Sequence, residues 1–266
     1  MSVHPNKDGS LLFENPRAFQ GKGETTWEGL IKSVRGKVKG TKAKIRLGAS
    51  SGEWKAMVAD EAARTTFAKN IKKVLEKNNL DGIDLDFEWA ENEKEYEDYS
   101  LAILKMREVL GDKYLFSVSL HPVCYKISKK AIEAVDFISL QCYGPSPVRF
   151  PIEKYCSDIQ MVLEYGIPKE KLVAGVPFYG VTKDNSKKTE AYFNFVQDGL
   201  ITSPSQNEVI YQGDTYVFDG QDNIRIKTRY AKEQKLKGMM SWDLATDLPL
   251  NDSKSLLKTM TEELRK

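Results

Sequence analysis

Histidine is nearly absent from this 266-residue chain, which contains only His4 and His121. The three cysteines, Cys124, Cys142 and Cys156, are an odd number and lack the spacing of a metal site. A disulfide framework, a zinc site and a histidine metal cluster are therefore not expected. If the chain is an enzyme, its chemistry depends on carboxylates and hydroxyls, and we predict neither a metal nor a cofactor.

Long apolar runs and an excess of charge are also lacking. No apolar run approaches the roughly 18 residues of a membrane-spanning helix, and the first ten residues, MSVHPNKDGS, have no apolar core typical of a signal peptide. The 40 basic residues nearly balance the 38 acidic ones, which gives a net charge of +2. We therefore expect a monomer with neither a nucleic-acid partner nor a membrane partner.

Short β-type runs alternate with amphipathic helical stretches along the chain. The strand candidates are KIRLGAS (44–50), GIDLDFE (82–88), LFSVSLH (115–121), FISLQCY (137–143), LVAGVPF (172–178) and GMMSWDL (238–244). The helical period is found in 61–79, 95–111, 152–166 and 224–238. Gly111, Gly166 and Gly238 each stand just before a strand, where helix C-caps are expected.

This order of strands and helices predicts parallel pairing in an α/β fold. At this length a TIM (β/α)8-type barrel is the leading architecture, and a doubly wound sheet is the alternative. No strand candidate is followed by a GxGxxG or GxxxxGK[ST] phosphate loop, which weighs against a nucleotide-binding doubly wound fold. We predict a single catalytic barrel domain over residues 1–266, in which six strands are readable.

Residues 181–223 interrupt the alternation and are predicted to form a loop-rich insertion. The segment is polar but contains six aromatic residues: Tyr192, Phe193, Phe195, Tyr211, Tyr216 and Phe218. It follows the fifth strand candidate, on the side of a barrel where active sites form. The insertion is interpreted as one wall of a substrate cleft, with a surface hairpin as the alternative.

The stretch LDGIDLDFEWA (80–90) places a ladder of carboxylates in a predicted strand. Because strand side chains alternate between faces, Asp84, Asp86 and Glu88 share one face and the intervening apolar residues share the other. Three ionised carboxylates this close are costly in a low-dielectric site, so at least one must hold or share a proton, or bind a cation. A solvated strand face, a divalent-metal site and glycoside hydrolysis with a carboxylic general acid remain the alternatives.

The segment DGIDLDFE resembles the DGxDxDxE signature of glycoside hydrolase family 18, the chitinases and endo-β-N-acetylglucosaminidases. All five defined positions of the signature match. Further segments resemble the third, sixth, seventh and eighth strands of that family's barrel: KAKIRLGASSGEW (42–54), FISLQCYG (137–144), VAGVPFYG (173–180) and IRIKTRYAKEQKLKGMMSWDLATD (224–247). The resemblance covers the chain from about Trp27 onward.

The resemblance implies a retaining mechanism in which the substrate's own 2-acetamido oxygen attacks the anomeric carbon and forms an oxazolinium ion. Glu88 would be general acid and then general base, Asp86 would accept the acetamido N–H, and Asp84 would share a proton or a hydrogen bond with Asp86. Tyr143 would donate to the acetamido oxygen. Trp242 would form the apolar floor under the sugar, with Gln141 and Tyr179 as further substrate-binding residues.

The sequence departs from the family pattern in three places. The SxGG of the third strand reads GASSG, and the Met-x-Tyr-Asp after the sixth strand reads Gln141-Cys142-Tyr143-Gly144. The family's first two strands should precede NKDGSLLF (6–13), but too few residues do so. We therefore expect either an N-terminally shortened version of a longer protein or another segment in the gap, with residues 2–13 as the candidate for one further strand.

The function predicted from this resemblance is hydrolysis of β-1,4 bonds next to N-acetylglucosamine in chitin or chitooligosaccharides. An endo-β-N-acetylglucosaminidase acting on N-glycans and a non-hydrolytic carbohydrate-binding relative are the alternatives. The expected partner is an oligo- or polysaccharide that contains N-acetylglucosamine. The family implies an extracellular or periplasmic location, although this chain shows no signal peptide.

Overall fold

The computed structural model describes residues 2–13, 26–143, 150–184 and 188–266. Gly144, named above, and residues 185–187 of the predicted insertion lie outside these ranges. The chain divides into two compact units: the first holds Met1–Leu120 and Cys124–Ile138, the second His121–Val123 and Ser139–Lys266. Within the described ranges, no helix is both long and apolar enough to cross a membrane.

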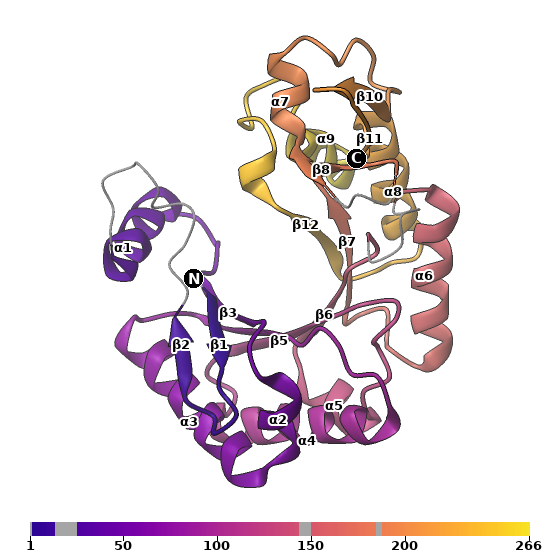
Figure 1. The fold of residues 1–266 in the computed structure, drawn as a ribbon. Helices are drawn as coiled ribbons and strands as arrows, with labels where there is room; N and C mark the ends of the chain where they lie inside the picture. Colours follow the sequence, from indigo (N-terminus) through magenta and orange to yellow (C-terminus); the bar gives the residue numbers. More distant parts are fainter. Residues whose placement is uncertain (1, 14–25, 144–149, 185–187) are drawn as a thin grey trace. The chain divides into compact units, whose positions relative to one another are not determined.

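The first unit is a sheet covered by helices (Figure 1). Its strands pair in the order β2-β1-β3-β4-β5, followed by the first residues of β6. The strand bounds are β1 (Ser2–Pro5), β2 (Leu11–Phe13), β3 (Arg46–Ser50), β4 (Gly82–Asp86), β5 (Leu115–Leu120) and β6 (Phe137–Leu140). β1 is parallel to β3, as β3 is to β4 and β4 to β5. The helices are α1 (Trp27–Val38), α2 (Trp54–Ala59), α3 (Glu61–Lys77), α4 (Glu93–Leu110) and α5 (Lys129–Ala134).

The prediction that residues 2–13 supply a further strand is confirmed. β1 joins β3 in parallel, and β2 returns antiparallel to β1. The turn between them is closed by hydrogen bonds from Asn6 N–H to the Ser10 carbonyl and from Gly9 N–H to the Asn6 carbonyl, both 2.9 Å. Gly9 has a φ of +81°, a conformation that glycine adopts without strain.

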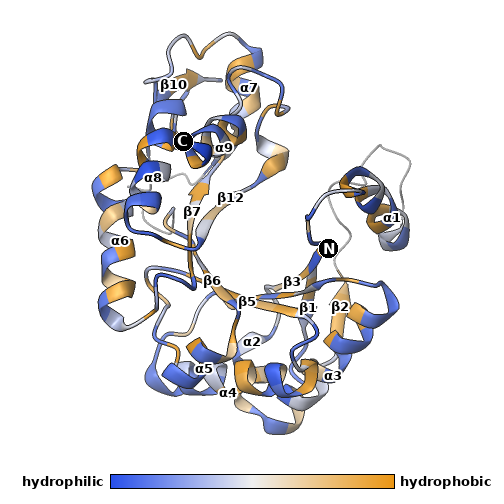
Figure 2. Ribbon diagram, turned by 180° about the vertical axis from the view of Figure 1, so that it is seen from behind, coloured by the Kyte–Doolittle hydropathy of each residue, from blue (hydrophilic) through white to orange (hydrophobic). Residues whose placement is uncertain are grey.

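The second unit contains the end of β6 together with β7 (Leu172–Pro177) and β12 (Gly238–Trp242), which pair in the order β12-β7-β6. Its helices are α6 (Ile152–Tyr165), α7 (Tyr192–Gln197), α8 (Gln221–Glu233) and α9 (Leu256–Arg265), with a 3-10 turn η2 (Leu244–Thr246). Apolar and polar bands alternate along α6 in Figure 2, because Tyr155, Ile159 and Val162 point into the core. All six strands predicted from the sequence are thus present as β3, β4, β5, β6, β7 and β12.

A second, antiparallel sheet lies mainly within the segment predicted to be an insertion. Its order is β10-β11-β8-β9, formed by β8 (Tyr179–Thr182), β9 (Thr189–Ala191), β10 (Glu208–Tyr211) and β11 (Asp214–Val217). Four of the aromatic residues noted above are buried: Tyr192, Phe195, Tyr216 and Phe218. The Phe195 ring lies 5.5–5.6 Å from three neighbouring rings. These aromatic side chains therefore pack against each other as the core of the small sheet.

Two of the three predicted helix-ending glycines are confirmed. Gly111 (φ +62°) caps α4 and Gly166 (φ +109°) caps α6. The prediction for Gly238 is wrong, because α8 already ends at Glu233 and Lys235 takes the positive φ of +56°. Gly238 is instead the first residue of β12.

Asp81 and Gly82 fix the beginning of β4. The Asp81 carboxylate accepts a hydrogen bond of 2.8 Å from Ile45 N–H, and the Asp81 N–H donates to the Ile45 carbonyl at 2.8 Å. A Cβ on Gly82 would lie 1.9 Å from the carbonyl oxygen of Leu115. These two residues of the DGxDxDxE motif are thus structural: they join β4 to both of its neighbours.

Gly82→Ala is therefore expected to destabilise the protein strongly. The added methyl group would have to push apart the backbones of β4 and β5, which we expect to cost about 3 kcal/mol or more, at the upper end for overpacking. Urea unfolding monitored by circular dichroism measures the loss. Gly238→Ala is the matched control, since Gly238 also begins a parallel strand but a Cβ there meets no atom within 4 Å. Equal stabilities of the two variants would contradict the prediction.

Candidate active site

The two faces of β4 separate packing from chemistry, as the sequence predicted. The buried face holds Ile83, Leu85 and Phe87, with at most 3% of each residue exposed. On the other face Asp84 and Asp86 are partly exposed, and Glu88 is exposed. Exposure of the carboxylates is therefore greatest at the carboxyl end of the strand, where barrel active sites form.

An aromatic cluster holds the buried face of β4 in place. The Trp54 ring of α2 stacks on Phe87 at 5.6 Å, and the Tyr99 ring of α4 meets Phe87 edge-on at 5.2 Å. Phe67 of α3 packs against Trp54 at 5.5 Å. The Tyr99 hydroxyl donates a hydrogen bond of 3.2 Å to the Leu85 carbonyl. Because Phe87 directly precedes Glu88, this cluster fixes the backbone from which Glu88 projects.

Asp84, the deepest acid of the ladder, is hydrogen-bonded by two serines of β5. Ser117 Oγ donates to Oδ1 and Ser119 Oγ donates to Oδ2, the latter at 2.7 Å. Burial raises the pKa of Asp84, and the serines and the nearby Arg46 oppose that rise. The sequence reasoning missed these serines, although their alternation in LFSVSL already placed both on one strand face.

Glu88 lies two residues beyond the end of β4, so the strand is shorter than the predicted 82–88. The backbone after Glu88 is held by α4 and a nearby thiol. Ala90 N–H donates to Cys124 Sγ at 3.3 Å, and Glu91 N–H donates to Glu95 Oε2 at 2.8 Å. The Glu88 carboxyl is thus an exposed acid on a fixed backbone, which suits a general acid that must reach a substrate.

The carboxylate ladder does not form a recognisable metal centre. Across residues 2–13, 26–143, 150–184 and 188–266, no three His, Cys, Asp or Glu side chains are grouped so that they could hold a metal ion. The arrangement offers instead one solvent-facing acid and two deeper carboxylates. It can supply a proton at the carboxyl end of β4 and negative charge below it.

In the second unit, the structure brings Tyr143 and Tyr179 together. Their rings meet edge-on at 6.5 Å, and the Tyr143 hydroxyl lies 3.8 Å from Met240 Sδ. Tyr143 is 5% exposed. A Cβ on Gly175 of β7 would lie 2.6 Å from the Leu140 carbonyl oxygen and 3.0 Å from the Tyr143 ring, so this position has room only for glycine. Met240 and Gly175 were not predicted from the sequence.

Trp242 ends β12 and is 57% exposed. Since side chains two apart share a strand face, Trp242 is on the same face as Met240, which contacts Tyr143. Gln141, two residues before Tyr143, is 9% exposed. Burial raises the pKa of the intervening Cys142 thiol to about 12, which keeps this thiol protonated and a poor nucleophile.

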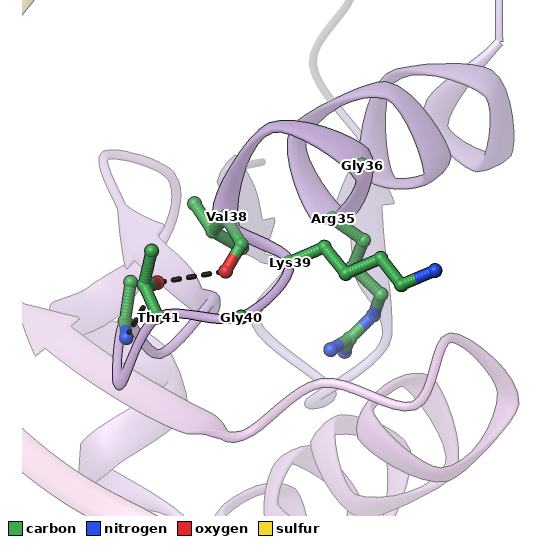
Figure 3. Close-up of a pocket in the computed structure, with 7 residues that line it drawn as sticks. Arg35, Gly36, Val38, Lys39, Gly40 and Thr41 are labelled. Carbon is green, nitrogen blue, oxygen red and sulfur yellow. Dashed lines mark hydrogen bonds between the residues drawn. The ribbon is translucent and has the colours of Figure 1, made fainter.

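A pocket in the first unit lies at the C-terminal end of α1 (Figure 3). It is lined by Arg35, Gly36, Val38, Lys39, Gly40, Thr41 and Ala43. Arg35 Nη1 lies 3.9 Å from the Asp81 carboxylate, which directly precedes β4. The pocket is therefore at the amino-terminal edge of the strands, the opposite edge from Glu88. Barrel active sites form at the carboxyl edge, so this pocket is not the candidate site.

The model of glycosyl hydrolases family 18 matches residues 6–247. The chain belongs to this family. Probable chitinase 2 of Drosophila melanogaster is 24% identical over 261 residues, which cover 74% of this chain and 54% of that protein. The chain thus spans about half the length of this curated relative.

Solved structures show the same fold at low sequence identity. A chitinase from Bacteroides thetaiotaomicron has a TM-score of 0.84 at 20% identity, covering 99% of this chain and 86% of that one. A class V chitinase from Nicotiana tobaccum in complex with NAG4 has a TM-score of 0.77 at 17% identity, covering 99% and 90%. The predicted α/β fold class, a TIM (β/α)8-type barrel, is confirmed. The extent of the catalytic domain and the roles of the site residues stay predictions.

Proposed function

We propose that this family 18 chain hydrolyses β-1,4 bonds next to N-acetylglucosamine in chitin or chitooligosaccharides. The observation that carries the proposal is the complete carboxylate ladder, with Glu88 exposed at the carboxyl end of β4 and Asp84 and Asp86 behind it. The chitinases among the relatives and structural neighbours support this reaction class. The NAG4 complex of the Nicotiana tobaccum chitinase supports an N-acetylglucosamine oligomer as the ligand.

Glu88 is the proposed general acid. Its carboxyl protonates the leaving glycosidic oxygen and then, as a carboxylate, activates the water that completes the reaction. Its exposed position allows both steps, because the proton must reach first a substrate oxygen and then a water molecule. The fixed backbone after Glu88 limits the entropy lost when the acid is positioned against the substrate.

The nucleophile in this proposal is the substrate's own acetamido oxygen, which closes an oxazolinium ring. Asp86 accepts the acetamido N–H and orients it, and the negative charge of the Asp84–Asp86 pair stabilises the positive charge that develops on that ring. Tyr143 donates its hydroxyl to the acetamido oxygen. The exposed indole of Trp242 stacks under the sugar ring, Gln141 hydrogen-bonds a sugar hydroxyl, and Tyr179 borders the substrate. These roles are those that the family resemblance implies for the matching residues.

The acetamido requirement gives a direct test of this mechanism. We expect the chain to cleave chitohexaose with the β-anomer as the first product by ¹H NMR, and to leave fully deacetylated chitosan oligomers intact. A control with EDTA present should give the same rate. First formation of the α-anomer, or equal cleavage of the deacetylated oligomers, would contradict substrate-assisted retention.

The same assay separates the alternative functions. Release of glycan from a high-mannose glycopeptide, without cleavage of chitohexaose, would show an endo-β-N-acetylglucosaminidase. Calorimetric binding of chitohexaose with no product by mass spectrometry would show a non-hydrolytic carbohydrate-binding protein.

A further inference from the structure

Arg46 is a charged side chain at the base of the carboxylate ladder. Its Nη1 lies 3.8 Å from Asp84 Oδ1 and donates a hydrogen bond to Ser117 Oγ, which in turn donates to Asp84. The strand register pairs Arg46 of β3 with Gly82 of β4, and Asp84 of β4 with Ser117 of β5. Since β4 lies between β3 and β5, the Arg46 side chain must cross β4 to reach Ser117.

The guanidinium is held in this crossing position by its neighbours. Gly82, which pairs with Arg46, has no side chain to obstruct the crossing. The ring of Phe137, the first residue of β6, lies 4.7 Å from the Arg46 guanidinium carbon, a distance typical of a cation–π contact. Only 26% of the Arg46 side chain and 20% of the Asp84 side chain are exposed. The charge pair is therefore partly desolvated, where an ion pair is screened less than at the surface.

Burial raises the pKa of Asp84, and three groups around it oppose that rise by favouring its ionised form. Arg46 from β3 supplies a positive charge, and Ser117 and Ser119 from β5 supply O–H donors. Further titratable groups lie near this pair: the charge of Asp136, before β6, acts on Arg46, and the charges of Asp84 and Asp86 both act on Tyr99 of α4, behind the strand. A carboxylate that accepts two hydroxyl donors beside a cation is stabilised in its charged state.

We propose that Arg46 is a positioning residue for the family 18 reaction: it keeps Asp84 ionised, so that the proton of the Asp84–Asp86 pair resides on Asp86. This inference rests on the proposed function. Two adjacent carboxylates cannot both be ionised cheaply, so a cation fixed beside one of them decides which one holds the proton.

The test measures the titration of the Asp84 and Asp86 carboxyl groups directly. Protein labelled with ¹³C at the aspartate carboxyl carbon is titrated by NMR, with Asp84→Asn and Asp86→Asn identifying the two signals. In the wild type we expect Asp84 to titrate below Asp86. In Arg46→Gln, which removes the charge but keeps a donor, we expect the Asp84 titration to move up by about one pH unit or more. Arg46→Lys should remain close to the wild type.

A matched control is Arg107→Gln. Arg107 also pairs with a carboxylate, with its Nη2 3.0 Å from Asp136 Oδ2, and lies over an aromatic ring, that of Phe116. Its loss should leave the Asp84 titration unchanged. An unmoved Asp84 signal in Arg46→Gln overturns the proposal. Should that variant fail to fold, wild-type Asp84 titrating above Asp86 overturns it equally.

The rate profile supplies a second readout. In Arg46→Gln the pair takes up its second proton at higher pH, so the acid limb of the kcat profile on chitohexaose should move up by about one unit. The alkaline limb should stay in place. If Arg46 had a merely structural role, Arg46→Gln would lower kcat without moving the acid limb, and that result would count against the proposal. If the wild type shows no turnover, the proposed function fails while the NMR titration still decides the role of Arg46.

Discussion

Glu88→Gln is expected to abolish turnover while leaving sugar binding intact. Glutamine keeps the size and the hydrogen-bonding capacity of the side chain but can neither protonate the leaving oxygen nor activate water. General acid–base catalysis contributes on the order of 10²–10⁴ in rate, so kcat on chitohexaose should fall by that factor. Because Glu88 is exposed and lies beyond the end of β4, its replacement should not disturb the fold.

The measurement combines product analysis by mass spectrometry with binding by isothermal titration calorimetry. Glu93→Gln is the matched control, since Glu93 is an exposed acid in the first turn of α4, the helix that follows Glu88 in the chain. It should retain wild-type kcat and binding. If Glu88→Gln hydrolyses chitohexaose within a factor of ten of the wild type, Glu88 is not the general acid.

Lys227→Met is expected to cost about 3–5 kcal/mol of unfolding free energy, the range for breaking one partner of a buried ion pair. Lys227 of α8 donates to Asp219 Oδ2 at 2.6 Å, and the two side chains are 1% and 0% exposed. The Lys227 ammonium also lies 5.5 Å from the centre of the Tyr155 ring. Methionine would fill the volume but leave the Asp219 carboxylate buried without its cation.

The pH dependence of this variant follows from Asp219. Burial already raises the pKa of Asp219, and Lys227 opposes that rise. Without Lys227 the folded protein holds the Asp219 proton to higher pH than the unfolded chain does. Stability then falls as pH rises, because the unfolded state binds fewer protons. Lys227→Met should therefore be more stable at pH 5 than at pH 7, measured relative to the wild type at each pH.

Two further variants make this result specific. The double variant Lys227→Met/Asp219→Asn should recover a large part of the loss, because it removes the buried charge. Lys183→Met breaks a second Lys–carboxylate pair of the same unit, 2.7 Å from Glu208, in which 62% and 50% of the side chains are exposed. It should change the unfolding free energy by less than about 0.5 kcal/mol. Similar losses for Lys183→Met and Lys227→Met would contradict the argument.

The sequence was most informative where a single strand carries both the packing and the chemistry. The period-two pattern of GIDLDFE separated Leu85 and Phe87 from Asp84 and Glu88 without any knowledge of the fold. That separation depends only on backbone geometry within one segment. The alternation of strands and helices likewise predicted all six strands, because each element buries one face with its own periodicity.

The neighbours of the ladder could not be read from the sequence in the same way. Arg46 and Ser117 are 71 residues apart and meet on Asp84 only because β3, β4 and β5 pair in a particular register. Tyr143 reaches Met240, 97 residues away, across a position in β7 that has room only for glycine. Contacts of this kind depend on register and close approach, which local patterns do not encode.

Residues 181–223 show the same limit. The sequence showed polar residues and aromatics, which fit either a cleft wall or a hairpin. Tertiary structure decided that Phe195 and Phe218 turn inward and form the core of a small sheet. By itself, then, the sequence determined the fold class and the order of the acids, because both depend on local periodicity. Only the tertiary structure decided which charges and hydroxyls surround those acids, because these come from distant segments.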